Sequence, residues 1–504
     1  MDICPRRWGP GADGHRSLAT TLTVWSTSPV TSHMTPEQFR QAGYAVVDWI
    51  ADYWASLAQR PVTSQGPPGA VAAGLPAGPP AGGEPVEAVL ADLDKLVAPG
   101  LTHWQHPGFF GYFPANTSGP SVLGDLVSAG LGVQGMLWST GPACTELETV
   151  MLDWLAEAMD LPARFRSAGR GGGVIQDSAS SATLVATLVA VHRAAGGRWR
   201  EVGVDRRYRV YTSTEAHSSV EKAARIAGLG AEGVRLVEVD PQSRAMSPVA
   251  LRAAIEADRA AGVVPALVVA TVGTTSTTAI DPLPQIGPIC AEHGVFLHVD
   301  AAYAGAAAVC PELRFGHAGL EYADSYCFDP HKWLLTGFDC DAFWVADSTE
   351  LVEALTVLPE YLRNAASESG AVIDYRDWQV PLGRRFRALK LWFVLRWYGV
   401  EGLREHIRSG VALAARFADR VRADERFELV TPHPYGLVCF RLRGADGPNE
   451  QLLSAVNGSG RVYLTHTRVA GRYTLRLAVG APQTAEAHVD EAWELLSRVA
   501  ETVG

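Results

Sequence analysis

Apolar runs alternate with polar turns through most of this chain, and their spacing predicts an α/β fold. From about residue 119 to 395, helix-like segments alternate with short runs rich in Val, Ala and aromatic residues, a pattern typical of layered α/β domains. The strands predicted from these runs are 208–212, 266–271, 295–299 and 341–345. Beyond residue 396, strand-like runs at 437–442 and 473–478 and a closing helix at 487–499 predict a smaller α+β domain.

A change of character at Met34 predicts where ordered structure begins. Residues 1–33 are rich in Ser, Thr, Gly and Pro and contain no continuous apolar segment of a secretory signal, so we expect a disordered extension. Thr35 can cap a helix, Pro36 suits its first position, and Gln38 can complete a capping box. We therefore expect a helix to start here, and the methionine is a candidate translation start.

A stretch rich in glycine and proline helps to predict how the chain divides into domains. The stretch 63–84 is rich in Gly, Pro and Ala and predicts an exposed linker, which a helix-like segment at 86–96 follows. We predict an N-terminal helical segment over 34–118, a large domain over 119–395 and a small C-terminal domain over 396–504.

Composition narrows the class of protein. A chain of 504 residues with 47% hydrophobic and 19% charged residues is long enough for two or three lobes around a sizeable core. The net charge of −11 gives no support for a nucleic-acid or anionic-membrane partner, and no run reaches the roughly 18 apolar residues of a membrane span. Seven scattered cysteines without a C-x-x-C motif argue against a disulfide framework and a zinc site. We expect a reducing compartment, the cytoplasm, and no metal.

One acid and one lysine indicate the chemistry. The apolar run 295–299 ends at Asp300, and Lys332 follows 32 residues later between apolar and aromatic residues. Taken singly, an acid at a strand end is typical of a turn or a helix cap, and a lone lysine is typical of a solvated surface. Together they suit pyridoxal phosphate, which needs a lysine amine for a Schiff base and a carboxylate to keep its ring nitrogen protonated.

Three further strand ends carry suitable groups. The glycine run 171–173 leads into a helix predicted at 181–190, where small residues, hydroxyls and free N–H groups could bind a phosphate or form an ordinary cap. His217 opens another helix and could stack on a ring or cap that helix. The hydroxyl-rich turn 271–278 follows a predicted strand, where α/β folds bind ligands. The dense aromatic run 103–114 is compatible with core packing and with the wall of a pocket for flat ligands.

Longer motifs carry a resemblance to a known family. The chain resembles the pyridoxal-phosphate-dependent aromatic L-amino-acid decarboxylases, within the group II decarboxylase family, over about residues 35 to 500. The matching stretches are 104–107, 142–148, 173–176, 216–219, 298–305, 330–334 and 381–387. The resemblance implies a type I aminotransferase-like fold with a mostly parallel central sheet. It also implies an obligate homodimer with shared active sites, in which the N-terminal segment packs.

The resemblance assigns roles to the residues around the cofactor. Lys332 resembles the Schiff-base lysine, Asp300 the partner of the pyridine nitrogen, and His217 the histidine that stacks on the ring beside the substrate carboxylate. The positions that match the phosphate and cofactor contacts are Ser178, Ala179, Ser180, Thr275 and Asp329. Position 329 is commonly Asn in relatives. An ionised Asp would repel a phosphate, so Asp329 is expected either to be protonated or to make its contact through backbone or water.

Tyr361 bears on the product of the reaction. The polar stretch 358–370 looks like the mobile catalytic loop of the family, in which this tyrosine protonates the substrate carbon after CO2 leaves. Relatives that make aldehydes often replace the tyrosine by Phe or the stacking histidine by Asn. Tyr361 and His217 are both present, which favours decarboxylation to an amine.

The substrate pocket is expected to be aromatic. Trp104 and Phe113, with Trp138 as a further candidate, would form its wall, while Ala115 stands where some relatives have Thr. Met136 stands where some relatives have an aromatic residue, and Gly383 leaves space for an indole. We expect tryptophan, phenylalanine or tyrosine as substrate in preference to a strongly catechol-selective site for DOPA, with modest discrimination among them.

Two other functions remain open. The nearer alternative is an aromatic aldehyde synthase or a decarboxylase of a non-aromatic amino acid in the same family. The more distant one is a metal-dependent hydrolase that uses His298, Asp300 and His331, although the chain lacks the usual His-Glu-x-x-His spacing.

Overall fold

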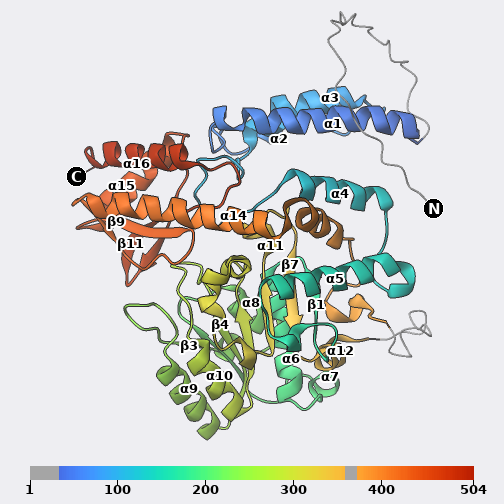
Figure 1. Ribbon diagram of the computed structural model, residues 1–504, viewed down its shortest axis with the longest axis vertical. Coiled ribbons are helices and arrows are strands. Elements are labelled where there is room, and N and C mark those ends of the chain that lie inside the picture. The colour runs from blue at the N-terminus through green and yellow to red at the C-terminus, as the bar shows by residue number, and fades with distance from the viewer. Residues whose placement is uncertain (1–32, 358–371, 504) are drawn as a thin grey trace, which may run out of the picture. The chain divides into compact units, whose positions relative to one another are not determined.

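The computed structural model describes residues 33–357 and 372–503, which belong to two compact units (Figure 1). The first comprises the chain up to Trp54 and Gly66–Gly100, and the second comprises Ala55–Gln65 and Leu101–Gly504. Almost all of the predicted extension lies outside the described residues. Residues 55–65 and 101–118 of the predicted N-terminal segment 34–118 lie in the second unit.

The first unit contains only helices among its described elements. Helix α1 (Pro36–Ser56) begins as the sequence predicts, with a reciprocal capping box. The Thr35 N–H donates to Oε1 of Gln38 over 2.9 Å, and the Gln38 N–H donates to Oγ1 of Thr35 over 3.2 Å. The other elements are α2 (Ala70–Gly74), α3 (Val86–Asp92), a π-helical turn (Leu93–Val97) and a 3₁₀ turn (Ala98–Gly100). The predicted linker is exposed almost throughout, but it includes the short helix α2.

The second unit is built around a seven-stranded sheet. Its strands are β1 (Gly172–Gln176), β2 (Tyr208–Ser213), β3 (Val234–Val237), β4 (Val264–Thr271), β5 (Phe296–Asp300), β6 (Ser325–Phe328) and β7 (Asp341–Val345). They are ordered β1-β7-β6-β5-β4-β2-β3, and only the two ladders of β7 are antiparallel. The predicted α/β class, with a mostly parallel central sheet, is confirmed.

Alternate residues of the strands face two apolar layers of helices, as an α/β sheet requires. One core joins Val268 of β4 to helices α5 (Pro142–Ala158), α9 (Pro248–Ala260) and α10 (Leu283–His293). The other core joins the next residue, Val269, to helices on the opposite face. Those helices are α6 (Ala179–Ala194), α8 (Ser219–Ile226) and α12 (Ser348–Leu355). The other helices of this part of the chain are α4 (Gly119–Leu131), α7 (Trp199–Val202) and α11 (Pro330–Trp333).

The C-terminal part of the second unit holds a four-stranded antiparallel sheet of order β10-β11-β9-β8. Its strands are β8 (Phe427–Leu429), β9 (Leu437–Leu442), β10 (Thr465–Val469) and β11 (Arg472–Ala478), and α15 (Asp446–Gly458) and α16 (Glu486–Ala500) pack beside them (Figure 1). The long helical stretch α14 (Ala388–Ala423) is interrupted at Gly399, whose φ of 63° is left-handed and suits a residue without Cβ. The predicted boundary at 395 falls inside α14.

None of the helices within the described ranges combines the length and the apolar character that crossing a bilayer demands.

Candidate active site

The predicted acid and lysine meet at one edge of the large sheet. Strands β4, β5 and β6 run parallel, so their carboxyl ends lie side by side, and Thr271 pairs with Asp300, which pairs with Cys327. The chain continues from β6 through Asp329 into α11, which carries Lys332. This edge is where ligands bind in open α/β sheets.

Lys332 rests on a buried carboxylate. Its Nζ lies 2.6 Å from Oδ2 of Asp329, whose Oδ1 accepts the N–H of Ala179 over 3.1 Å. Burial alone would raise the pKa of Asp329, but the attraction of Lys332 and His331 holds it below its usual range. Burial alone would lower the pKa of Lys332, but Asp329 and Asp300 raise it. In this arrangement Asp329 is an ionised partner of the lysine and touches the first residue of α6.

Asp300 is buried, with 4% of its surface exposed, and its Oδ1 accepts the N–H of Ala302 over 3.0 Å. Burial raises the pKa of this carboxyl, while Lys332 and the Ala302 N–H act in the opposite direction. A buried acid with a raised pKa is suited to sharing a proton with a basic ring nitrogen.

His217 lies close enough to Asp300, Lys332 and Asp329 to interact electrostatically with all three. Its Nδ1 accepts the N–H of Ser219 over 3.2 Å, which leaves Nε2 as the ring nitrogen that carries the proton. His217 is an exposed residue, yet neighbouring protein atoms take its imidazole partly out of water, and this lowers its pKa. His217 is therefore neutral at neutral pH.

The predicted phosphate-side residues lie at the start of α6. Ser178 is the N-cap and makes no capping hydrogen bond through its side chain, while Ala179 is buried and Ser180 is exposed. The N-terminus of a long helix attracts an anion, although here the N–H of Ala179 already donates to Asp329. Thr275 is exposed, and its carbonyl oxygen accepts from Arg476 over 2.8 Å.

The groups at this edge match the needs of pyridoxal phosphate. They comprise a lysine amine, a buried acid, a neutral imidazole and the N-terminus of α6. In addition, Oγ1 of Thr271, at the end of β4, is buried without a hydrogen-bond partner in the described part of the chain. Lys332, Asp300, His217 and Ser178–Ser180 would hold the group, which supplies an electron sink.

Aromatic rings stack behind the lysine. Phe113 lies on Tyr303 with ring centroids 3.8 Å apart, and Tyr303 lies on Trp333 with centroids 4.8 Å apart. Arg476 covers Phe113, with its guanidinium carbon 5.3 Å from the ring centroid. The predicted wall residue Phe113 is thus joined through Tyr303 to the neighbour of Lys332.

The other predicted substrate residues fall into separate groups. Trp104 is stacked on Tyr112, with centroids 5.5 Å apart, and is 38% exposed. Met136 and Gly383 belong to adjoining segments, because the Gly135 N–H donates to the carbonyl of Arg384 over 3.1 Å. The carbonyl of Ala115 accepts from Gln105.

Tyr361 and its loop lie outside the described residues.

Asn116 is a positioning residue that the sequence did not reveal. It is 1% exposed, and its N–H donates to the carbonyl of His331 over 2.8 Å. Its Oδ1 accepts the N–H of Leu335 over 3.1 Å, and its Nδ2 donates to Gly480 over 2.8 Å. Asn116 therefore ties the segment of Phe113 and Ala115 to both ends of α11. A single Asn after an aromatic run carries no signal of this role.

A buried ion pair holds two of the quoted motifs together. Arg384 contacts Glu148, and both side chains are at most 4% exposed. Glu148 also accepts the N–H of Ile175 in β1 over 2.8 Å, and Arg384 donates to Oε1 of Gln379 over 2.6 Å. These contacts connect the motifs around residues 148 and 384 to strand β1.

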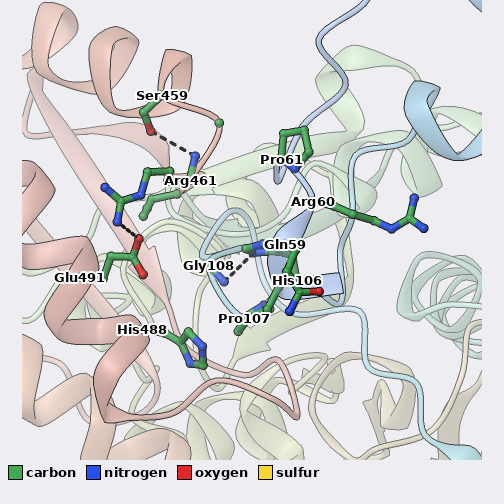
Figure 2. A pocket seen from close by; sticks show the side chains of 13 residues that line it. Gln59, Arg60, Pro61, His106, Pro107, Gly108, Ser459, Arg461, His488 and Glu491 are labelled. Carbon is green, nitrogen blue, oxygen red and sulfur yellow. Dashed lines mark hydrogen bonds and ion pairs between the residues drawn. The ribbon is translucent and has the colours of Figure 1, made fainter. Parts of the chain in front are cut away.

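A pocket of about 330 Å³, lined by none of the predicted site residues, lies elsewhere in the same unit (Figure 2). Figure 2 shows Arg461 paired with Glu491, and the Arg461 N–H donates to Ser459 over 3.1 Å. The histidines of the pocket also have partners, since His106 accepts the N–H of Gly108 and His488 that of Ala485. This pocket contains no lysine and no unpaired acid, and nothing in it indicates chemistry.

His298, Asp300 and His331 are the residues that the metal-dependent hydrolase hypothesis requires as ligands. No group of three or more His, Cys, Asp or Glu residues within 33–357 and 372–503 is arranged to hold a metal ion. His298 is fully buried, with Nδ1 2.8 Å from the hydroxyl of Ser325, and Nδ1 of His331 accepts the N–H of Cys340.

Comparison with known proteins gives a consistent result. The family model described as the pyridoxal-dependent decarboxylase conserved domain matches residues 68–443 of the chain. The chain is 46% identical to the aromatic-L-amino-acid decarboxylase of Mus musculus, over 93% of this chain and 99% of that protein. It is also 46% identical to the phenylacetaldehyde synthase of Arabidopsis thaliana, over 93% and 96%. A crystal structure of Oryza sativa TDC with PLP and tryptamine superposes with a TM-score of 0.91 at 42% identity, covering 94% of this chain and 99% of that one.

Proposed function

This chain belongs to the pyridoxal-dependent decarboxylase family, and we propose that it converts aromatic L-amino acids to the corresponding amines and CO2. The substrates would be tryptophan, phenylalanine, tyrosine or DOPA. The observation that carries the proposal is the placement of Asp300 at the end of β5 beside Asp329 and Lys332, which follow the end of β6, with His217 within electrostatic reach. The relatives that act on aromatic amino acids, matched over nearly the whole chain, support this substrate class.

Each residue has a distinct task in holding the cofactor and the substrate. Pyridoxal phosphate, when bound, accepts the electron pair that the departing carboxyl group leaves behind. Lys332 would hold the cofactor covalently, and Asp300 would keep a proton on its ring nitrogen. Neutral His217 would cover the ring without adding a charge beside the substrate carboxylate. Ser178, Ala179 and Ser180 would bind the phosphate at the N-terminus of α6.

Proton delivery decides between amine and aldehyde. We assign Tyr361 the return of a proton to the substrate α-carbon, and Lys332 the exchange of protons at the substrate amine. Tyr361 lies outside the described residues, so this role rests on its sequence context. Similarity to the phenylacetaldehyde synthase keeps aldehyde formation as the second candidate.

The aromatic ladder supports a flat substrate side chain. Tyr303 and Arg476 cover the faces of the Phe113 ring, which would therefore meet a substrate side chain with its rigid apolar edge. Ala115 and Met136 are half-buried and would shape the pocket beyond it. Gly383 and Trp104 complete the proposed set; a Cβ at position 383 would lie 3.2 Å from Nε2 of Gln134, so an indole placed there would have to displace that side chain.

We also propose a homodimer with shared active sites. No side chain of α1 is buried within the single chain, although Phe39, Tyr44 and Val47 expose 56%, 66% and 42% of their surfaces. Helix α4 likewise exposes Leu126 and Leu131. Apolar side chains in such numbers on two helices are typical of obligate interfaces.

A reducing compartment, the cytoplasm, fits the cysteines. The six cysteines within the described residues are buried and free.

Product analysis on a panel of amino acids tests the proposal. The purified enzyme with pyridoxal phosphate would be given tryptophan, phenylalanine, tyrosine, DOPA, glutamate and histidine, with amine, aldehyde, ammonia and CO2 measured together. We expect equal amounts of amine and CO2 from the aromatic acids, with little aldehyde. Aldehyde and ammonia as main products would favour the synthase, and turnover only of glutamate or histidine would overturn the substrate class.

A further inference from the structure

A second buried acid stands behind the lysine and its carboxylate. Asp341 is the first residue of β7 and is fully buried, with 0% of its surface exposed. It pairs across the sheet with Gln176 of β1, and its neighbour Ala342 pairs with Phe328 of β6. The chain leaves β6 at that point, and the antiparallel register brings Asp329, the next residue, beside Asp341, where the two carboxyl groups shift each other's pKa.

Asp341 lacks the donors that a buried carboxylate requires. Neither of its oxygens receives a hydrogen bond from an N–H or hydroxyl donor of the described residues. Asp329, in contrast, has the Lys332 amine and the N–H of Ala179. An ionised carboxylate without donors is far more costly to bury than a neutral acid, whose single O–H can donate to a neighbouring carboxylate.

We propose that Asp341 is a positioning residue that acts through Asp329. As a neutral acid it donates a hydrogen bond to Asp329 and so fixes that carboxylate between the start of α6 and the Lys332 amine. The pair then carries one negative charge instead of two beside the phosphate side of the cofactor site. This inference rests on the proposed function, because it concerns the lysine that holds pyridoxal phosphate.

The charged surroundings agree with this proton distribution. Burial raises the pKa of Asp341 well above its usual range, and Asp329 raises it further, while Lys332 acts in the opposite direction. The other titratable groups that face the pair are Asp300 of β5, Cys327 of β6, His331 of α11 and Cys340. His217 also interacts electrostatically with Asp329, so the potential cations around the pair are Lys332, His331 and His217, and burial lowers the pKa of both histidines. Lys332, whose pKa is raised, is thus the cation that faces the adjacent acids Asp329 and Asp341.

Asp341→Asn separates a neutral Asp341 from an ionised one. The amide keeps the shape and a donor but cannot carry charge. The pyridoxal phosphate Kd and the pH at which the visible absorbance of the bound cofactor titrates would be measured in the full-length enzyme. If Asp341 is neutral, we expect the Asn variant to stay within about threefold of the parent Kd and within about 0.3 pH unit of its titration midpoint.

An ionised Asp341 gives a different result. Removing its charge would relieve repulsion of the phosphate, and the Asn variant would then bind the cofactor about tenfold more tightly. Its titration midpoint would fall by about one pH unit, because Lys332 would lose a stabilising charge. That outcome overturns the proposal, and it can be read even if a more drastic variant fails to fold.

Asp341→Ala tests positioning. Loss of the donor should weaken cofactor binding about tenfold and raise the titration midpoint, because the full charge of Asp329 would then act on the Lys332 nitrogen. In an Asp329→Asn background the same change should cost less than about threefold, because Asp341 acts through Asp329. A lower Tm with unchanged Kd and midpoint would reduce Asp341 to a structural role and contradict the proposal.

Asp258→Asn is the matched control. Asp258 is also buried, but it pairs with Arg209 and Arg235 and accepts from Tyr211, away from the lysine. Its variant should lower the Tm and leave the Kd and the midpoint unchanged. Failure of the parent enzyme to bind pyridoxal phosphate would contradict the proposed function itself, whereas normal parent binding with unresponsive Asp341 variants contradicts this inference alone.

Discussion

Two buried acids, Glu148 of helix α5 and Asp341 of strand β7, show opposite uses of a carboxyl group. Glu148 is matched within the chain by Arg384 and by the N–H of Ile175. Asp341 meets another acid, Asp329, and the two share one lysine. A matched pair loses stability when either partner is removed, whereas a pair of acids with one cation responds to whatever binds that cation. The pair of Glu148 and Arg384 therefore stabilises the fold around the site, whereas we assign Asp341 and Asp329 the positioning of the lysine that would hold the cofactor.

The largest effect is expected from Lys332→Ala. Without the amine the cofactor has no covalent attachment, and turnover should fall by about 10³-fold or more, in the range seen when a catalytic group is removed. The cofactor absorbance should vanish after dialysis. Lys222→Ala, a change at an exposed lysine of α8, is the control and should leave both measurements unaltered. A variant that retains turnover would remove Lys332 from the mechanism.

Arg384→Met tests the supporting pair. It leaves Glu148 buried without its cation, and the free energy of unfolding should fall by about 3–5 kcal/mol. Denaturant titration measures this loss. Adding Glu148→Gln should recover part of it, because the unpaired charge is then gone. A loss below about 1 kcal/mol would show that Glu148 is satisfied by other groups.

Asp300→Asn should act on rate more than on binding. The amide keeps the size of the side chain and its hydrogen bond to Ala302, but it cannot hold a proton on the ring nitrogen. We expect cofactor binding to persist and turnover to fall by about 10²-fold. Absorbance titration and amine formation measure the two effects separately. Turnover within about threefold of the parent would contradict the role of Asp300.

The smallest effect concerns pH and a third buried group, His298, two residues before Asp300. Burial lowers its pKa to about 3, from an ordinary value of 6.5, so the folded state favours the neutral ring. Its contribution to stability is fully present above pH 6.5 and is lost as the pH falls towards 3, at up to about 1.4 kcal/mol per pH unit. The unfolding free energy of His298→Asn should fall less steeply between pH 6.5 and 4.5. Equal slopes would show that His298 titrates normally.

The strand ends were predictable because each follows a long apolar run. β5, β7 and the ends of β4 were located to within a residue or two, and these runs placed Asp300 and Lys332 together. Asp341 opens a correctly predicted strand, yet its role was hidden because it depends on the antiparallel placement of β7 beside β6. The part of Asn116 likewise arises from hydrogen bonds to residues more than 200 positions away. Such long-range pairings leave no local pattern.

Covalent trapping tests the central claim most directly. The chain contains four lysines, Lys95, Lys222, Lys332 and Lys390. The enzyme would be reduced with borohydride in the presence of pyridoxal phosphate, digested and mapped by mass spectrometry. We predict a single pyridoxyl label on Lys332, which aromatic amino acids added before reduction should diminish. A label on another lysine, or none, would contradict the account.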